Sequence, residues 1–389
     1  MPHAFVGHIK DDLKPFSVGD FSFYDILDTK KYSLALVSMK DRHFALSIKQ
    51  KEGLYLVKPE KITRPSELNI TKEAIRLFCE NCTDGIEKSN LTLTKQKAEP
   101  SNLLDPLYFC SHPEFFEGEV SVEVGFGSGR HLLWRAKEEP NKKFIGVEIY
   151  KPSIEQVAKQ CEIQGIKNIY LVDFDARLLI ETMPQSSLSE VYVHFPIPWP
   201  DSPTRRVISE NFLRVCEKAL KEDGHVELRS DDRDYFEYAF NSAMGIDGIR
   251  VDAYKNKGIE VTSKYEDRWL RQGKDIFEMQ IYPRKNDKKQ SKKVDFGFEN
   301  EITLQNIQNL SRGAQISDNV LVSFEDIFTS RVGNGCAFKV TFGDPARPDR
   351  RYIVAKDGKA SYYPFNPLCV EASGKAHKII KECLYGTNS

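Results

Sequence analysis

A strand that runs into a glycine-rich turn constrains the fold of this chain more than any other stretch. Residues 120–124 read Val-Ser-Val-Glu-Val, and Gly125, Gly127 and Gly129 follow directly. Glycine lets the backbone turn sharply and approach a ligand more closely than a side chain would allow. A helix is expected from about Arg130, and its N-terminus would face the ligand. The unit predicts a nucleotide-type site in an α/β domain, although a glycine-rich turn alone is weak evidence.

Three acidic residues lie at or near the ends of successive predicted strands. Glu123 lies in the first strand, Glu148 is near the end of the strand at 143–149, and Asp175 follows the strand at 169–172. Glu148, about twenty residues beyond the last glycine, would accept hydrogen bonds from ribose hydroxyls, and Asp175 would lie near an adenine amino group. Each acid alone could equally be a solvated strand end or a helix N-cap. Together they resemble the pattern of S-adenosylmethionine-dependent methyltransferases, which makes S-adenosyl-L-methionine the expected cofactor.

The composition is that of an ordinary globular protein. Of the 389 residues, 40% are hydrophobic and 29% are charged, and the length suits two or three domains. Without a long apolar run or a secretory signal, we expect a cytoplasmic protein that has no membrane partner. The eight cysteines show no disulfide-like spacing, which suits a reducing compartment. The net charge of -1 is uninformative about nucleic acid, but basic residues gather at 205–206, 264–274 and 284–293.

The hydrophobic pattern divides the chain into three structured regions. Residues 1–85 alternate apolar and polar positions and end in a helix, which predicts a small β-rich (α+β) module. Residues 86–117 are polar and irregular and are interpreted as a linker. Residues 118–283 alternate strands with helices, which predicts an α/β domain with a doubly wound, Rossmann-like, seven-stranded methyltransferase sheet. After a basic linker at 284–293, residues 294–389 predict a second β-rich module with a terminal helix.

The two β-rich modules resemble each other. Phe-Tyr-Asp-Ile-Leu at 23–27 is similar to Phe-Glu-Asp-Ile-Phe at 324–328, and both modules continue to a proline and then a helix. Short β patterns coincide easily, so an internal duplication is a hypothesis at this point.

Further motifs in the central region resemble one family, and they occur in its order. They are Glu-Val-Gly-Phe-Gly-Ser-Gly at 123–129, Gly-Val-Glu at 146–148, Asp-Ala at 175–176, Phe-Pro-Ile-Pro-Trp at 195–199, Arg-Arg-Val-Ile at 205–208, Ser-Asp at 230–231 and Thr-Ser-Lys-Tyr-Glu-Asp-Arg at 262–268. Residues 118–283 are thereby similar to the bacterial tRNA (guanine-N7-)-methyltransferases, the TrmB family of class I methyltransferases. The β-rich flanks lie outside the usual family pattern.

The resemblance implies transfer of a methyl group from S-adenosyl-L-methionine to N7 of a guanosine in the variable loop of tRNA. The residues expected to bind the cofactor are Glu123, Gly125, Gly127, Gly129, Glu148 and Asp175. The expected substrate-binding residues are Trp199, Arg205, Arg206, Asp231, Thr262, Ser263, Lys264, Tyr265 and Glu266. Trp199 would stack on the extruded guanine or close the end of the sheet. Arg205 and Arg206 would bind phosphate or cap the following helix.

One departure from the family pattern bears on the chemistry. The family's loop reads Phe-Pro-Asp-Pro-Trp, and this chain has Ile197 in place of the aspartate. Guanine N7 carries an in-plane lone pair and no proton, so it attacks the methyl group directly once the atoms are aligned. The product base is cationic, and a nearby carboxylate would stabilise the developing charge. Asp231 and Glu266 are the candidates for this catalytic role, and Ile197 predicts a slower enzyme more than an inactive one.

Other functions remain open on the sequence alone. A methyltransferase of this fold with another substrate and a tRNA-binding protein that has lost catalysis are both compatible with the motifs. A nicotinamide-dependent oxidoreductase is disfavoured, because Arg130 occupies the third glycine position of the dinucleotide fingerprint. Cys79, Cys82, Cys110 and His112 could supply zinc ligands, but the intervening stretch lacks a ribbon-like pattern and we expect no metal. Both a monomer and a homodimer stay open.

Overall fold

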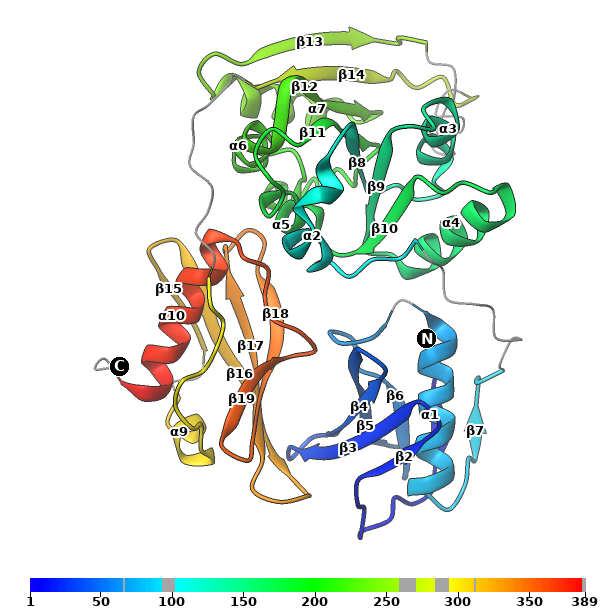
Figure 1. Ribbon diagram of the computed structural model, residues 1–389, viewed down its shortest axis with the longest axis vertical. Helices are drawn as coiled ribbons and strands as arrows, with labels where there is room; N and C mark the ends of the chain where they lie inside the picture. The colour runs from blue at the N-terminus through cyan, green and yellow to red at the C-terminus, as the bar shows by residue number, and fades with distance from the viewer. Residues whose placement is uncertain (66, 93–101, 259–270, 284–293, 311–312, 387–389) are drawn as a thin grey trace. The chain divides into compact units, whose positions relative to one another are not determined.

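The computed structural model describes residues 1–389 with the exception of 66, 93–101, 259–270, 284–293, 311–312 and 387–389 (Figure 1). The chain forms two compact units. Unit 1 combines Met1–Ala98 with Lys293–Ser389, and unit 2 comprises Glu99–Lys292. The two ends of the chain, which the sequence pattern presents as separate modules, therefore build one unit together.

Unit 2 is a doubly wound α/β domain around a seven-stranded sheet, as the sequence predicts. Its parallel strands are β10 (Ile169–Asp173), β9 (Lys143–Glu148), β8 (Val120–Val124), β11 (Leu188–His194) and β12 (Leu220–Ser230), in this spatial order. Strand β14 (Phe277–Tyr282) runs antiparallel to β12, and the edge strand β13 (Arg250–Lys255) pairs antiparallel with β14, so it has the same direction as β12. The strand order reverses between β8 and β11, and ligands of such sheets bind in the crevice at this switch point.

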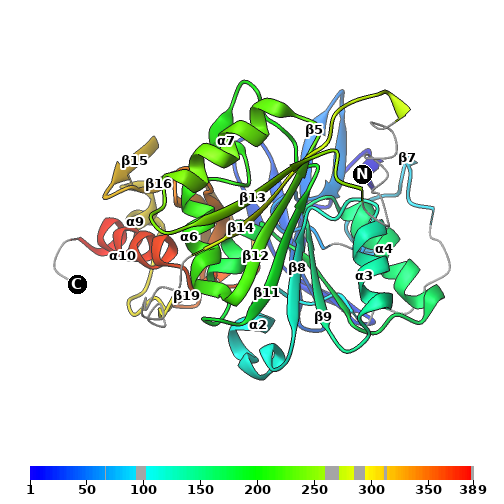
Figure 2. The ribbon, with the colours of Figure 1, turned by 90° about the horizontal axis from the view of Figure 1, so that it is seen from above.

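Helices cover both faces of this sheet. Figure 2 shows α3 (Arg130–Glu138) and α4 (Lys151–Gln164) on one side, with α6 (Glu210–Ala219) and α7 (Arg233–Met244) on the other. The short α5 (Ala176–Glu181) packs beside α6. Helix α6 begins directly after Ser209, which is its N-cap. The Ser209 hydroxyl accepts a hydrogen bond from the Phe212 N–H and so ends the preceding loop there.

The residues before β8 cover the outer strand of this sheet. Leu103 forms a parallel bridge with Leu171 of β10. The short helices α2 (Tyr108–Ser111) and η1 (Pro113–Phe116) follow, and the Phe115 ring packs edge-on against Tyr170 at 4.8 Å. A sheet edge that is covered in this way is protected from pairing with another chain.

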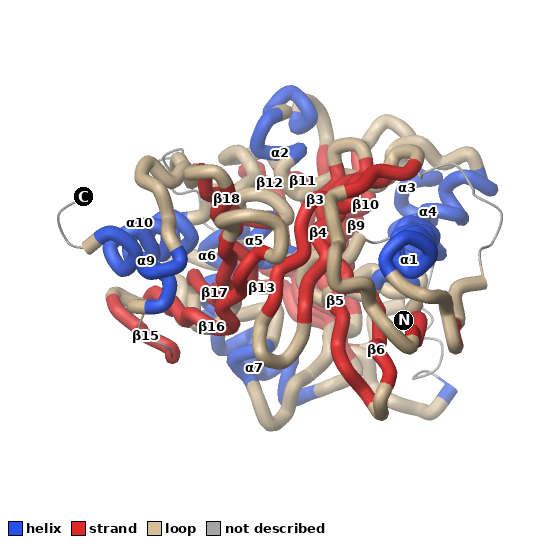
Figure 3. Tube along the Cα trace, turned by 90° about the horizontal axis from the view of Figure 1, so that it is seen from below, coloured by secondary structure: helices blue, strands red, loops and turns tan. Residues whose placement is uncertain are grey.

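Unit 1 consists of two β-rich halves that share one sheet. The N-terminal half is the meander β3 (Phe21–Asp28), β4 (Ser33–Met39), β5 (Arg42–Lys51) and β6 (Leu54–Pro59), and α1 (Leu68–Cys82) packs on it. The C-terminal half is the meander β16 (Val320–Ser330), β17 (Cys336–Gly343), β18 (Asp349–Lys356) and β19 (Lys359–Tyr363). Helices α9 (Leu304–Gln308) and α10 (Glu371–Tyr385) pack on this half (Figure 3). The short strands β1 (Ala4–Val6), β2 (Phe16–Val18), β7 (Lys88–Ser89) and β15 (Gly313–Ser317) complete the 12-stranded sheet of the described residues.

An approximate two-fold axis relates the two halves. Strand β3 pairs with β16 in antiparallel orientation, with Asp28 opposite Thr329. Continuing the repeat from Phe23 and Phe324 makes Asp28 and Thr329 equivalent residues, so the axis passes between them. Each strand also carries a register shift directly after the equivalent phenylalanine. This symmetry supports the internal duplication that the sequence suggests.

The two halves also share a hydrophobic core. Leu27 and Leu34 from the N-terminal half pack with Phe328 and Tyr352 from the C-terminal half. The Tyr363 hydroxyl, which is on β19, donates to the Phe44 carbonyl on β5 and lies 3.3 Å from the Val37 carbonyl on β4. Each half therefore completes the burial of the other. Among the described residues, no helix is both long enough and apolar enough to span a membrane.

Candidate functional site

The carboxyl ends of the parallel strands in unit 2 meet along one edge of the sheet. Glu123 is the residue before the end of β8, Glu148 ends β9, and Asp231 directly follows β12. Glu148 is in register with Asp173, the last residue of β10, and Asp175 lies two residues beyond it. The structure therefore places the predicted cofactor acids and Asp231 on the same edge, next to the glycine turn.

The glycine turn is built so that only glycine fits at its last position. Gly129 has a φ of +69°, and a Cβ there would collide with Val157 of α4. Gly129 is also the N-cap of α3, so the N-terminal N–H groups of this helix lie at the strand ends. A turn of this kind leaves room for a ligand against the backbone.

Glu148 is held in place by backbone donors. Its carboxylate accepts hydrogen bonds from the N–H groups of Gly127 at 3.1 Å, Ile149 at 2.8 Å and Tyr150 at 3.0 Å. A carboxylate has further lone pairs, which remain suitable for ribose hydroxyls. The side chains of Ile149 and Tyr150 are 73% and 63% exposed. Sequence reasoning missed this apolar pair, whose signal is its position directly after the strand-end acid.

Asp175 caps the helix that follows it. Its Oδ1 accepts the Arg177 N–H at 2.9 Å, and Oδ2 lies 2.7 Å from the Arg177 guanidinium. The contacts of Asp175 in the structure are therefore those of a helix N-cap. Its place near an adenine amino group stays a prediction.

Two histidines that were not among the predicted site residues, the buried His131 and the half-buried His194, link Glu123 to the neighbouring strands. The Nδ1 atom of His131, in the first turn of α3, lies 2.8 Å from Oε2 of Glu123. The His194 ring, at the end of β11, lies 4.5 Å from the His131 ring. His194 Nε2 in turn lies 2.8 Å from Oε1 of Glu227 on β12. The sequence signal was their position, one just after the glycine turn and one just before the proline-rich loop.

The charge on Glu227 determines which ring nitrogen of His194 carries a proton. Burial opposes ionisation of Glu227, but hydrogen bonds from His194 and His225 outweigh it and hold the pKa of Glu227 well below its ordinary value. Gln280 also donates to Oε2 of this carboxylate, at 3.3 Å. An ionised carboxylate only accepts hydrogen bonds, so His194 carries a proton on the nitrogen that faces Glu227.

The proline-rich loop at 196–200 is fastened to α7 by Arg206. This arginine is only 7% exposed, and its Nε donates to the Pro198 carbonyl at 2.7 Å. Its guanidinium lies over the rings of Tyr235 and Tyr238, at 5.3 Å and 4.7 Å. The Arg206 side chain thus faces the loop and the helix rather than solvent.

The rest of the loop presents its side chains differently. The exposed Arg205 guanidinium lies 4.4 Å from the Trp199 ring centre, and Trp199 has a φ of +43°, a conformation that is uncommon outside glycine. Ile197, at the position where the family has an aspartate, is 64% exposed. Trp199 therefore already stacks on one cation, and Ile197 is free of packing constraints.

Asp231 lies in a charged neighbourhood. Its Oδ2 accepts a hydrogen bond from Lys274 Nζ at 2.7 Å. Two residues earlier, Arg229 forms a fully buried ion pair with Glu278, whose second oxygen lies 2.7 Å from Lys257 Nζ. These pairs fix the backbone that carries Asp231. The predicted substrate residues Thr262, Ser263, Lys264, Tyr265 and Glu266 and the basic stretch at 284–293 lie outside the described residues.

The cysteines do not resemble a metal site. Cys79 and Cys82 belong to α1 of unit 1, whereas Cys110 and His112 belong to unit 2. Burial raises the pKa of both Cys79 and Cys82 to about 12. Within the described part of the chain, no group of three or more histidine, cysteine or acidic side chains is arranged to hold a metal ion.

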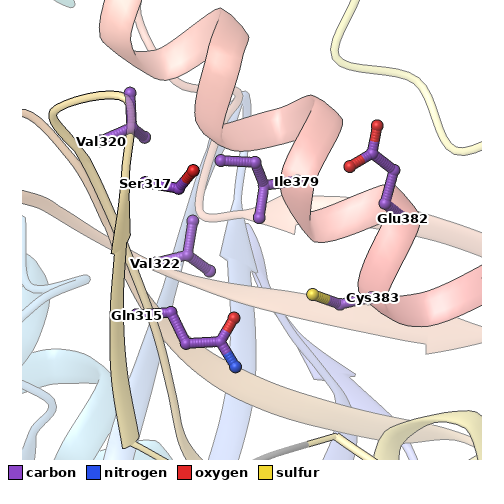
Figure 4. A pocket seen from close by; sticks show the side chains of 7 residues that line it. All are labelled: Gln315, Ser317, Val320, Val322, Ile379, Glu382 and Cys383. Atoms are coloured by element: carbon purple, nitrogen blue, oxygen red, sulfur yellow. The ribbon is translucent and has the colours of Figure 1, made fainter. Parts of the chain in front are cut away.

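A pocket of about 310 Å³ lies in unit 1, between β15, β16 and α10 (Figure 4). Its lining residues are Gln315, Ser317, Val320, Val322, Ile379, Glu382 and Cys383. The floor is mostly apolar, and the glycine turn and strand-end acids belong to the other unit. We therefore assign this pocket no part in the candidate site.

Comparisons with known proteins show what the chain is similar to. Residues 117–279 match a family described as "Putative methyltransferase". A Wolinella succinogenes protein named tRNA (guanine-N(7)-)-methyltransferase is 33% identical, over 99% of this chain and 100% of that protein. Proteins of the same name from Campylobacter fetus and Helicobacter hepaticus are each 31% identical, over 99% of both chains. Among solved structures, the 16S rRNA methyltransferase KamB is 14% identical, with a TM-score of 0.35 over 45% of this chain and 92% of that chain. The matches to the relatives extend across unit 1 as well as unit 2.

Proposed function

The chain belongs to the tRNA (guanine-N(7)-)-methyltransferase family, and on that premise we propose that it transfers the methyl group of S-adenosyl-L-methionine to N7 of a guanosine in the tRNA variable loop. The observation that carries the proposal is the sheet edge of unit 2, where the glycine turn, Glu123, Glu148 and Asp231 come together. We place the reaction in the cytoplasm, where tRNA is modified.

The residues at this edge fit S-adenosyl-L-methionine by their chemistry. The Cβ-free turn and the N–H groups that begin α3 suit the cofactor's carboxylate, and the Glu123 carboxylate suits its ammonium group. Glu148, oriented by three backbone N–H groups, accepts hydrogen bonds from the ribose hydroxyls. Ile149 and Tyr150 offer apolar surface to the adenine ring, and Asp175 lies within the same edge. The cofactor supplies an electrophilic methyl group on a sulfonium.

The main task of the protein in this reaction is to align N7, the methyl carbon and the sulfur. Guanine N7 uses its lone pair to form the bond to the methyl carbon, while the carbon–sulfur bond breaks and its electron pair stays on sulfur. Positive charge thereby moves from sulfur to the guanine ring, and the Asp231 carboxylate stabilises it there. Trp199 stacks on the base, and its partner Arg205 contacts the tRNA backbone. No general base is needed, because N7 has no proton to lose.

The test is a methylation assay that maps the modified position. Transfer RNA from a strain that lacks 7-methylguanosine is incubated with the pure protein and S-adenosyl-L-methionine, and then reduced with borohydride and cleaved with aniline. We expect cleavage at a single variable-loop guanosine. Glu148→Ala should lose cofactor binding in calorimetry, and Asp231→Asn should retain cofactor binding but methylate more slowly. Glu237→Gln, an exposed change on α7, is the matched control.

Two results would contradict the proposal, and each would point to a different function. Cofactor binding without cleavage of tRNA would indicate another substrate for the same fold. Retained affinity for tRNA without cofactor binding would indicate a tRNA-binding protein that has lost catalysis.

A further inference from the structure

We infer that His131 and His194 are positioning residues. They orient the cofactor carboxylate Glu123 and link it to the strand that leads into the proline-rich loop at 196–200, which we call the substrate loop. The inference rests on the proposed function, because it assigns both histidines to that cofactor site. Methyl transfer to N7 requires no proton transfer, so acid–base chemistry does not explain two buried imidazoles at this edge of the sheet. Their contacts do.

The first link orients Glu123. His131 lies two residues after Gly129, so the first turn of α3 carries its ring back over the end of β8. Its Nδ1 lies 2.8 Å from Oε2 of Glu123, and the Tyr192 ring packs edge-on against it at 4.8 Å. One carboxylate oxygen is therefore engaged by the histidine, and the second remains for the cofactor ammonium.

The second link ties this pair to the neighbouring strands. Glu123 is in register with Tyr192 on β11, and Tyr192 is in register with Glu227 on β12. The three side chains therefore form one row across the same face of the sheet. His194, two residues after Tyr192, lies on that face too. Its ring is tilted against the His131 ring at 4.5 Å, and Glu227 holds it at 2.8 Å.

The third link reaches the substrate loop. His194 is the last residue of β11, and Phe195 follows with a φ of +49°. The Phe195 N–H donates to the Arg229 carbonyl of β12 at 2.7 Å, which fixes the point at which the chain leaves the sheet. His194 contacts His131 on one side and Glu227 on the other. The loop that carries Trp199 therefore begins at a position that depends on the row formed by Glu123, Tyr192 and Glu227.

The experiment is a double-mutant cycle on cofactor affinity. The affinity for S-adenosyl-L-methionine is measured by calorimetry, without tRNA, for the full-length chain and for His131→Phe, Glu123→Gln and the double variant. Phenylalanine keeps the aromatic packing against Tyr192 and removes the donor. We expect His131→Phe to raise Kd for the cofactor by about tenfold, and by less than about twofold when Glu123 is already glutamine.

Further variants separate positioning from a merely structural role. His131→Asn, which keeps an N–H donor near Nδ1, should restore most of the affinity. In the methylation assay, His131→Phe should raise KM for the cofactor and leave KM for tRNA unchanged, whereas His194→Phe should raise both. His112→Asn, in the same unit but outside the row, should change neither constant.

Several outcomes would overturn the inference. An unchanged cofactor Kd in His131→Phe would do so, as would an effect of equal size in the Glu123→Gln background. A rise in Kd that tracks a lower melting temperature and is not reversed by asparagine would show that the histidine only stabilises the fold. If the unaltered protein binds no S-adenosyl-L-methionine, the proposed function itself fails. If it binds and methylates normally while His131→Phe is indistinguishable from it, the inference alone fails.

Discussion

At the scale of single residues, Ile197 is where this chain departs most clearly from its family's pattern. Its side chain is 64% exposed in the loop at 196–200, so packing does not require an apolar residue there. We propose that position 197 lies near the base, so an aspartate there, as the family resemblance implies, would stabilise the positive charge that the base gains in the reaction. Electrostatic stabilisation of developing charge is often the largest single contribution to catalysis. The isoleucine therefore removes a charge without contributing to the core.

Restoring the acid should speed the reaction. We expect Ile197→Asp to raise kcat by about tenfold, the effect of roughly 1.4 kcal/mol of transition-state stabilisation. Because the site is exposed, the free energy of unfolding should change by less than about 0.5 kcal/mol. Single-turnover methylation and urea unfolding measure the two effects, with Ile197→Asn as the uncharged control. Equal rates for the aspartate and asparagine variants would show that charge at this position does not matter.

At the scale of elements, the loop at 196–200 depends on helix α7. The two adjacent arginines after the loop have opposite environments. Arg206 is buried against Tyr235 and Tyr238 and binds the Pro198 carbonyl, whereas Arg205 is exposed beside Trp199. A buried arginine that contacts a loop carbonyl fixes the loop, and an exposed one is available to phosphate.

Alanine at each position should separate these roles. Arg206→Ala should lower the free energy of unfolding by about 2 kcal/mol, because it removes a charge-assisted hydrogen bond and leaves a carbonyl unpaired. Arg205→Ala should change stability by less than about 0.5 kcal/mol. It should instead weaken tRNA binding and reduce the salt dependence of that binding by about one unit of slope. Urea unfolding and filter binding at several salt concentrations provide the measurements. A similar loss of stability in both variants would contradict this division.

At the scale of the whole molecule, unit 1 is assembled from both ends of the chain. Strands β3 and β16 meet around an approximate two-fold axis, and the core between the halves takes side chains from each. Leu27 and Leu34 pack against Phe328 and Tyr352, so neither half buries its inner face alone. The relatives match this chain over both halves, which indicates that unit 1 is part of the protein's inherited architecture.

A chain that ends at residue 292 should therefore lose its N-terminal half as well. We expect proteolysis to cut within residues 1–98, because the apolar face that the C-terminal half covers becomes exposed. Unit 2, residues 99–292, keeps its own core and should resist digestion. Limited trypsin digestion followed by mass spectrometry, with the full-length chain as control, measures this. Protection of residues 1–98 in the shortened chain would show that the N-terminal half is stable by itself.

The sequence by itself determined the features that depend on local pattern. The strand–turn–helix unit at 120–138, the order of strands and helices in unit 2, and the acids Glu123, Glu148 and Asp175 at or near successive strand ends were all predicted, because periodicity and turn chemistry act over short distances. The family resemblance added the reaction, and the full-length relatives agree with it.

Tertiary structure decided everything that joins distant segments. The pairing of Asp28 with Thr329, the burial of Arg206 under α7, and the contact from His194 to Glu227 bring together residues that are far apart in the sequence. Such contacts follow from which faces the packed elements bury together, and no local pattern specifies them. The same reason explains why Arg205 and Arg206 look alike in the sequence and differ in the fold.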